Sequence, residues 1–226
     1  MTKDRMILKC AFNWLLFVCF FVLPLRNNAG PIDSLQREIR KSNESEKFNL
    51  WLQIGLHYRE AGNFDSANLS FTEAKSFITS PNQQGVFLHN RGGLAWRMGE
   101  FNQAKKYYDS AIAVRRGLND SSETYKSMYY LSLVYRDKSE YDSAIDLSKQ
   151  IVRAYKQMND SASLADIYNH LGSIFIRLNQ FDSAEMWYKK SIGIRFAMKD
   201  SLKMADSYSN MGKIAREQGL YTDAIS

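Results

Sequence analysis

The sequence has almost no residues of the types that build metal or disulfide sites. Its two cysteines, Cys10 and Cys19, both lie near the N-terminus. Beyond them no disulfide framework and no cysteine-ligated metal can form. The three histidines, His57, His89 and His170, show no metal-ligand spacing such as H-x-x-x-H. We therefore expect no metal and no cofactor.

Catalytic signatures and a strong charge bias are missing as well. The sequence contains neither a P-loop nor a G-x-S-x-G elbow. Arg91-Gly92-Gly93 lies inside a helical pattern rather than after a strand, so we assign it to packing and not to phosphate binding. The net charge is +6, and half of it precedes Gly30, which is too mild to indicate nucleic acid. We expect a protein that is not an enzyme and does not bind nucleic acid.

The N-terminus has the pattern of an export signal. Basic residues in Met1–Lys9 precede a run of mostly apolar residues, Cys10–Leu25. A small residue, Ala29, follows the helix breaker Pro24. This pattern predicts a signal peptide over residues 1–29. The run is shorter than the ~20 residues of a membrane helix, and an uncut N-terminal anchor is the alternative.

Either form of the N-terminus places the remaining residues outside the cytoplasm. Export without disulfides fits a bacterial envelope, with the protein periplasmic or anchored to the membrane through its N-terminal segment. Residues 30–47 are polar and charged. They are expected to be a linker or a short helix.

The dominant feature of the rest is a motif that recurs at a nearly constant interval. Its marker is an aromatic residue followed, three positions later, by an alanine, and the alanines stand at positions 67, 104, 144, 184 and 224. A fixed period of about 40 residues indicates supersecondary units stacked in an array. The five markers are Phe64-Asp65-Ser66-Ala67, Phe101-Asn102-Gln103-Ala104, Tyr141-Asp142-Ser143-Ala144, Phe181-Asp182-Ser183-Ala184 and Tyr221-Thr222-Asp223-Ala224.

Each marker follows a helical pattern, so the unit contains two helices. Apolar residues recur at i, i+3 and i+7 in Tyr168-x-x-Leu171-Gly172-x-x-Phe175, which marks one face of a helix. Gly172 and Ala184 are small enough for the two helices to pack closely. The first helices should end at a left-handed residue, namely Gly62, Gly99, Asn179 or Gly219. Tight turns between repeats are expected at Asn119-Asp120-Ser121, Asn159-Asp160-Ser161 and Lys199-Asp200-Ser201.

This unit resembles the tetratricopeptide repeat, whose pattern is W-x2-L-G-x2-Y followed by A-x3-F. The resemblance covers residues 48–226 and implies an all-α fold, a right-handed α-solenoid of helix–turn–helix pairs. The period exceeds the roughly 34 residues usual for the family and is similar to that of the extended subgroup, in which both helices gain about a turn. Ser132 replaces the glycine of the third repeat. The predicted repeats are residues 48–84, 85–124, 125–164, 165–204 and 205–226, the last one truncated.

The resemblance also implies a ligand groove. In the family the first helices line the concave face, and the residue before the apolar–Gly pair points toward the ligand. The implied ligand-binding residues are Gln53, Asn90, Tyr130, His170 and Asn210, together with Trp96, Arg136 and Arg216 about one turn further along the same helices. We expect them to hold an extended segment of a protein partner.

Two functions fit this interpretation. The first is a protein-binding scaffold in the envelope. The second is the sensory region of a signalling protein whose kinase or transcription-regulator output lies beyond Ser226. The sequence stops at Ser226, soon after Ala224, inside a second helix and without a polar closing helix, so we expect a fragment of a longer protein.

Overall fold

The computed structural model describes residues 30–217, and all the regular structure in that range is helical. The predicted signal peptide and the fifth marker lie outside the described residues. Within them, no helix is long and apolar enough to cross a membrane. The chain divides into two compact units, one ending at Lys41 and the other beginning at Ser42. The prediction of an all-α fold is confirmed.

The first unit contains one short helix, α2 (Pro31–Ile39). Pro31 occupies its first turn, where the missing N–H costs nothing. The backbone N–H of Gly30 donates to a carboxylate oxygen of Asp33 at 3.3 Å. A linker and a short helix were the two alternatives predicted for residues 30–47. The structure has the short helix, over residues 31–39.

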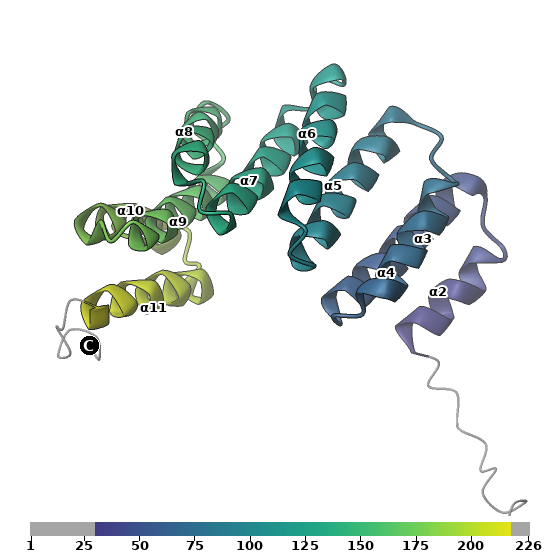
Figure 1. Cartoon of the computed structure of the whole chain (residues 1–226), viewed down its shortest axis with the longest axis horizontal. Coiled ribbons are helices and arrows are strands. Elements are labelled where there is room, and N and C mark those ends of the chain that lie inside the picture. Colours follow the sequence, from purple (N-terminus) through teal and green to yellow (C-terminus); the bar gives the residue numbers. More distant parts are fainter. Residues whose placement is uncertain (1–29, 218–226) are drawn as a thin grey trace, which may run out of the picture. The chain divides into compact units, whose positions relative to one another are not determined.

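The second unit is a series of helices joined by short turns (Figure 1). All of them have 17 residues except α4, which has 12. Two such helices and two short turns account for the period of the repeat. The helices are α3 (Glu44–Glu60), α4 (Phe64–Lys75), α5 (Pro81–Arg97), α6 (Phe101–Gly117), α7 (Ser121–Asp137), α8 (Tyr141–Gln157), α9 (Ser161–Arg177), α10 (Phe181–Ala197) and α11 (Ser201–Glu217).

The turn residues follow the sequence prediction closely. Asp120 and Asp160 cap α7 and α9, accepting from backbone N–H groups at 3.1 and 3.0 Å. Because of these caps, the first helices begin about one turn before the predicted repeat boundaries. Gly62, Gly99 and Asn179 have positive φ, as predicted. Gly219 lies outside the described residues.

The sequence analysis missed the left-handed residue of the third repeat, which is Ser139 with φ 63°. The turns between repeats reach the same conformation at Asn119, Asn159 and Lys199. Serine and lysine tolerate this region less well than glycine or asparagine. No residue-type rule would therefore have selected Ser139 or Lys199.

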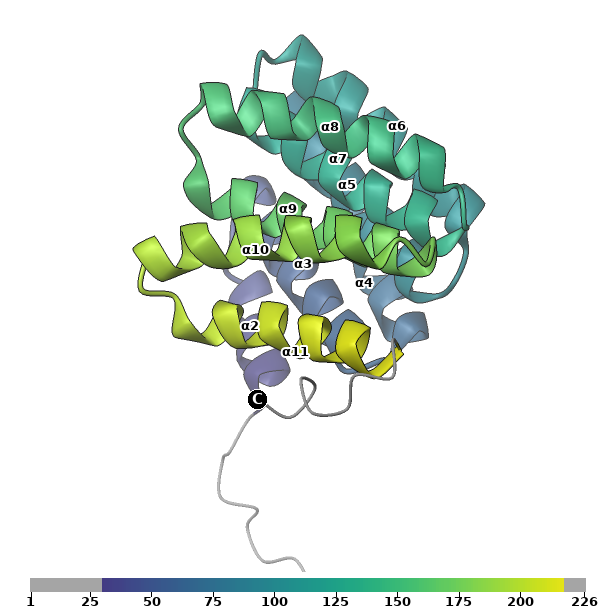
Figure 2. The same ribbon diagram turned by 90° about the vertical axis from the view of Figure 1, so that its left-hand side faces the viewer.

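First and second helices occupy different sides of the stack. Each odd-numbered helix from α3 to α11 contacts the next odd-numbered one, while no two even-numbered helices from α4 to α10 touch. Figure 2 shows the same arrangement at the α9–α11 end, where α10 packs between these two helices and nearer the viewer. The odd-numbered helices therefore form the inner, concave side of the second unit.

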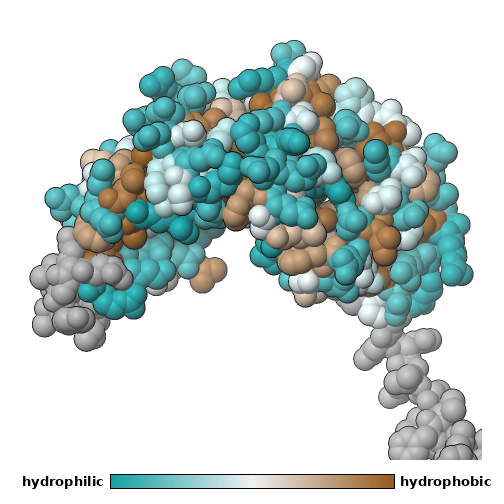
Figure 3. Space-filling model, viewed as in Figure 1, coloured by the Kyte–Doolittle hydropathy of each residue, from teal (hydrophilic) through white to brown (hydrophobic). Residues whose placement is uncertain are grey.

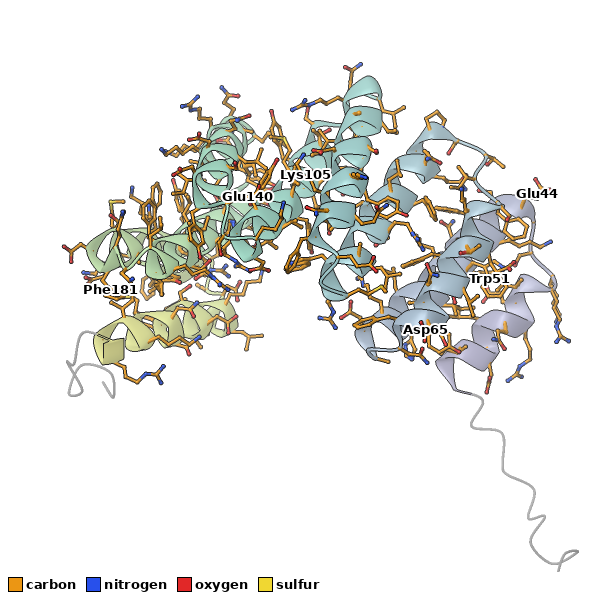
Figure 4. All side chains as sticks on the ribbon, in the orientation of Figure 1. Glu44, Trp51, Asp65, Lys105, Glu140 and Phe181 are labelled. Atoms are coloured by element: carbon orange, nitrogen blue, oxygen red, sulfur yellow. The ribbon has the colours of Figure 1, made fainter. Side chains whose placement is uncertain are left out.

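Inside the first, second and fourth pairs, small residues face large aromatic ones. A Cβ on Gly55 would lie 2.5 Å from the Phe71 ring, and one on Gly172 would lie 2.8 Å from the Tyr188 ring. Only glycine fits at such a contact. The marker alanines Ala67, Ala104, Ala144 and Ala184 are all fully buried. Phe181, labelled in Figure 4 at the start of α10, packs against a buried cluster that includes Ile214 of α11.

The third pair departs from this pattern on both helices at once. Ser132 stands where the other first helices have glycine, and Ser148 stands where the other second helices have Phe71, Tyr108 or Tyr188. Both serines are fully buried. The Ser148 hydroxyl donates to the backbone oxygen of Ala144 at 2.7 Å. The larger residue on one helix is therefore matched by a smaller residue on its partner.

Replacing Ala184 with Leu is expected to lower the free energy of unfolding by about 1–3 kcal/mol, because the added methyl groups have no space at the helix crossing. Urea denaturation measures the loss. Ala197→Leu, at an exposed position of the same helix, is the matched control. Equal stability of the Ala184 variant and the parent would contradict this helix pairing.

Candidate binding groove

The inner helices α3, α5 and α7 enclose a hollow of about 830 Å³, which we call the α3–α5–α7 groove. Its lining includes Asn90, Trp96 and Tyr130, three of the residues predicted to bind a ligand, together with Arg59. The tertiary structure thus brings together residues from three successive repeats. Figure 3 shows hydrophobic residues in small groups among hydrophilic ones on the visible face of the second unit, so that face has no single large apolar area.

Asn90 and Tyr130 keep hydrogen-bonding capacity for a ligand. The side-chain N–H of Asn90 donates to the backbone oxygen of Val86 at 2.9 Å, which fixes the amide and leaves its oxygen without a donor among the described residues. The Tyr130 ring packs edge-on against His89, with centroids 5.0 Å apart, and stacks on Tyr108 at 6.0 Å. Both predicted residues are partly exposed. They are therefore held in place and remain accessible.

Trp96 and Arg136 are instead tied into a network that links the second, third and fourth repeats. The Trp96 indole N–H and the Arg136 Nε both donate to the Asp137 carboxylate, each at 2.9 Å. Nη1 of Arg136 donates to the Ser173 hydroxyl at 3.3 Å. Partial burial raises the pKa of Asp137, but the bonds from Arg136 and Trp96 outweigh it and the pKa is lowered. These side chains stabilise the stack before any ligand arrives.

The prediction that His170 contacts a ligand is wrong. Only 3% of the residue is exposed. Its Nε2 lies 2.9 Å from the Ser132 hydroxyl, and its ring packs edge-on against Tyr129. Burial, with a contribution from Arg136, lowers the pKa of His170 to about 3, so the ring is neutral. The imidazole turns inward because Ser132, unlike a glycine, offers a buried hydroxyl as its partner.

The remaining predicted residues lie outside the α3–α5–α7 groove. Gln53 and Arg216 are exposed. Asn210 is partly exposed, and its oxygen accepts from Nζ of Lys213 at 3.0 Å. Gln53 lies on α3, while Asn210 and Arg216 lie on α11. Their assignment as ligand contacts therefore stays a prediction.

The sequence analysis assigned Gly93 to packing and selected neither Tyr108 nor His89 as a ligand-binding residue. All three line the groove. Tyr108 is fully buried, and its hydroxyl has no hydrogen-bond partner among the described residues. Burial raises its pKa, so the hydroxyl keeps its proton. The second glycine of Gly92-Gly93 was the one signal that could have drawn attention to this position.

His89 is neutral and held on one side by its neighbours. Burial and the charges of Arg115 and Lys126 lower its pKa to about 3. Its Nδ1 lies 3.1 Å from the Ser127 hydroxyl. The Arg115 guanidinium also bonds Ser127 and forms an ion pair with Glu123 at 2.7 Å. One wall of the groove is therefore a fixed polar cluster.

The fold and the row of inner helices define a class of protein. Two family profiles, both described as tetratricopeptide repeat, match residues 84–157 and 165–197. These two segments of the chain are therefore tetratricopeptide repeats. No curated protein sequence is significantly similar to it.

Solved structures share the fold at low sequence identity. BtubC (BKLC) from P. vanneervenii is 17% identical, with a TM-score of 0.69 over 85% of this chain and 82% of that one. A Rap protein complexed with Competence and Sporulation Factor is 14% identical, with a TM-score of 0.73 over 85% and 55%. A STAND protein with a tetratricopeptide repeat sensor from Pyrococcus horikoshii is 13% identical, with a TM-score of 0.71 over 81% and 31%. The chain thus spans about half of the Rap protein and under a third of the STAND protein.

Proposed function

We propose that this protein is a non-enzymatic scaffold that binds an extended segment of a protein partner in the α3–α5–α7 groove. The observation that carries the proposal is the groove itself. It lies on the inner helices of three repeats and combines aromatic walls with the unused side-chain oxygen of Asn90. Sites that combine apolar walls with a few placed polar groups are typical of ligand recognition.

The segment would then continue along the inner helices toward Asn210 and Arg216 on α11. Affinity would be spread over several main-chain hydrogen bonds rather than fixed by one anchor. We propose a location in the bacterial envelope as well, on the strength of the N-terminal export pattern. The membrane would be reached only through that N-terminal segment.

A second candidate function is the sensory region of a larger signalling protein. The similarity of the fold to a structure described as having a tetratricopeptide repeat sensor supports this candidate. The groove would then detect a peptide or protein signal. An output domain C-terminal to Ser226 in the full reading frame would distinguish this role from a free-standing scaffold.

The test begins with a partner, obtained by affinity capture with the full chain as bait. Asn90→Ala and Asn210→Ala are each expected to weaken binding about two- to tenfold, because each removes one net hydrogen bond of roughly 0.5–1.5 kcal/mol. Isothermal titration calorimetry measures the change. The thermal midpoint should stay nearly unchanged.

Asn102→Ala is the matched control, because Asn102 is exposed on α6, one of the outer helices. It should bind as the parent does. Parent-like affinity of both the Asn90 and the Asn210 variants would refute the groove as the binding site. Unfolding of both variants would refute their assignment as ligand contacts.

A further inference from the structure

Two equivalent places on the inner side pair an arginine with a buried tyrosine of the following repeat. In the first, the charge of Arg59 on α3 lowers the pKa of Tyr108 on α6, although burial raises it more. In the second, the charge of Arg136 on α7 has the same effect on the pKa of Tyr188 on α10, which burial also raises. Both tyrosines are fully buried, and neither hydroxyl has a hydrogen-bond partner among the described residues. The same arginine–tyrosine pair therefore occurs twice in the array.

The two places differ at one position, the residue after the glycine of the first helix. In the fourth repeat this residue is Ser173, whose hydroxyl accepts from Nη1 of Arg136 at 3.3 Å. In the second repeat it is Gly93, and no hydroxyl is present. Nη1 of Arg59 lies 2.7 Å, and the Tyr108 hydroxyl 3.5 Å, from where a Cβ of Gly93 would be. Nη1 of Arg59 therefore lies directly over the backbone of Gly93, without the hydroxyl that Arg136 bonds in the fourth repeat.

The remaining nitrogens of Arg59 are already engaged. Its Nε and Nη2 donate to one carboxylate oxygen of Glu60 at 3.1 and 2.9 Å. Among the described residues, Nη1 has no acceptor. The side chain of Arg59 is only 19% exposed, so water reaches it poorly. An acceptor from outside the chain would satisfy Nη1.

Gly93 makes room for the Arg59 guanidinium rather than for a buried ring. The neighbouring Gly92 is required, because its Cβ would come within 2.9–3.0 Å of three atoms of the Tyr108 ring. A Cβ on Gly93 would approach only the movable end of Arg59 and the Tyr108 hydroxyl. Glycine inside a helix costs roughly 1 kcal/mol relative to alanine. The sequence thus keeps a residue of low helix propensity where its structural effect is to let Nη1 of Arg59 approach the helix backbone.

The charges around this space favour an anion. Two pairs of cations each share one carboxylate: Arg59 and Arg97 share Glu60, and Arg115 and Lys126 share Glu123. The remaining acid in the lining of the groove, Asp120, caps α7. Positive charge is therefore in excess. A hydrogen bond from a charged donor to a carboxylate is about twice as strong as one between neutral groups.

We propose that a carboxylate of the bound segment lies beside Gly93, where it accepts a hydrogen bond from Nη1 of Arg59. It takes the place that the Ser173 hydroxyl holds in the equivalent site. This inference rests on the proposed function and narrows the partner to a segment with an Asp or Glu side chain at one position.

The experiment selects phage-displayed random dodecapeptides against the full chain. The enriched peptides should share one acidic residue. Replacing that residue with its amide should weaken binding tenfold or more, as expected for loss of a charged hydrogen-bond partner. Gly93→Ser, which installs the hydroxyl of the equivalent site, should lower the affinity for the acidic peptide to that of the amide peptide. The thermal midpoint of the variant should equal or exceed that of the parent.

Gly117→Ser is the matched control, because a Cβ at this exposed position of α6 meets nothing within 4 Å. It should bind the acidic peptide as the parent does. Enrichment of peptides without a shared acidic residue, or unchanged affinity of Gly93→Ser, overturns the carboxylate site and leaves the peptide-binding groove standing. Failure to enrich any peptide overturns the proposed function and this inference together.

Discussion

Acidification from pH 7 to pH 5 is expected to lower the free energy of unfolding by about 2 kcal/mol for each of His89 and His170, or about 4 kcal/mol together. Burial is the main cause of the low pKa of both rings, about 3 in the folded protein against 6.5 for a free histidine. The folded state keeps them neutral. The unfolded chain takes up a proton on each below about pH 6.5.

The sign of the change in stability with pH follows from this proton uptake. Above pH 6.5 both states are neutral and the histidines add no pH dependence. Between pH 6.5 and 3 only the unfolded state binds the protons, so stability is lost as the pH falls. Neighbouring charges also shift the pKa of both rings. Arg115, Lys126 and Arg59 oppose protonation of His89, and Arg136 opposes it at His170 while Asp137 favours it.

Carboxylates contribute in a lower pH range. The pKa of Asp137 is lowered from 3.8, so its stabilisation is present above that value and is lost only at more acidic pH. The interval from pH 6.5 to about 4 therefore reports mainly on the histidines. Urea unfolding at pH 7, 6 and 5 gives the slope of stability with pH.

Single variants assign the slope to its source. His89→Gln and His170→Gln should each remove about one proton from the uptake on unfolding, whatever their effect on stability at pH 7. His57→Gln, at an exposed position, should leave the slope unchanged. Variant and parent curves that run parallel between pH 7 and 5 would show that the buried histidines do not set the acid sensitivity.

Two substitutions of Tyr188 are expected to have very different effects. Tyr188→Ala should cost about 3–5 kcal/mol, because the ring is fully buried against Gly172 and its removal leaves a cavity. Tyr188→Phe should cost nothing or stabilise slightly. The buried hydroxyl makes no hydrogen bond among the described residues, so removing it also removes an unmet desolvation cost.

Urea denaturation of both variants at pH 7 measures the difference. Tyr208→Ala is the control, because 54% of Tyr208 is exposed. It should change stability far less than Tyr188→Ala. A loss of more than about 1 kcal/mol in Tyr188→Phe would mean that the hydroxyl has a hydrogen-bond partner.

The repeat was predictable from the sequence because its rules are local. Close packing of two helices requires a small residue at the crossing, and Ala67, Ala104, Ala144 and Ala184 supply it at a regular spacing. The caps Asp120 and Asp160 act on backbone groups three residues away. Such interactions recur wherever the motif recurs, so one sequence with five copies shows them without any alignment.

The binding side could be predicted only in part. Asn90 and His170 hold the same position in their repeats, yet Asn90 lines the groove and His170 is buried. The difference comes from a residue 38 positions away, Ser132, which bonds the imidazole. Position within a repeat gives the direction of the Cα–Cβ bond. It does not give the neighbour that a side chain meets.

The sequence by itself determined that the chain is an all-helical array, where its turns lie and which small residues sit at the helix crossings. Only the tertiary structure decided which inner positions are open. Arg59 meets Gly93 from the next repeat, whereas Arg136 meets Ser173. Helix formation and capping depend on residues within about one turn. Exposure, charge state and unpaired donors depend on contacts between successive repeats, whose residues are far apart along the chain, and those contacts exist only once the helices have stacked.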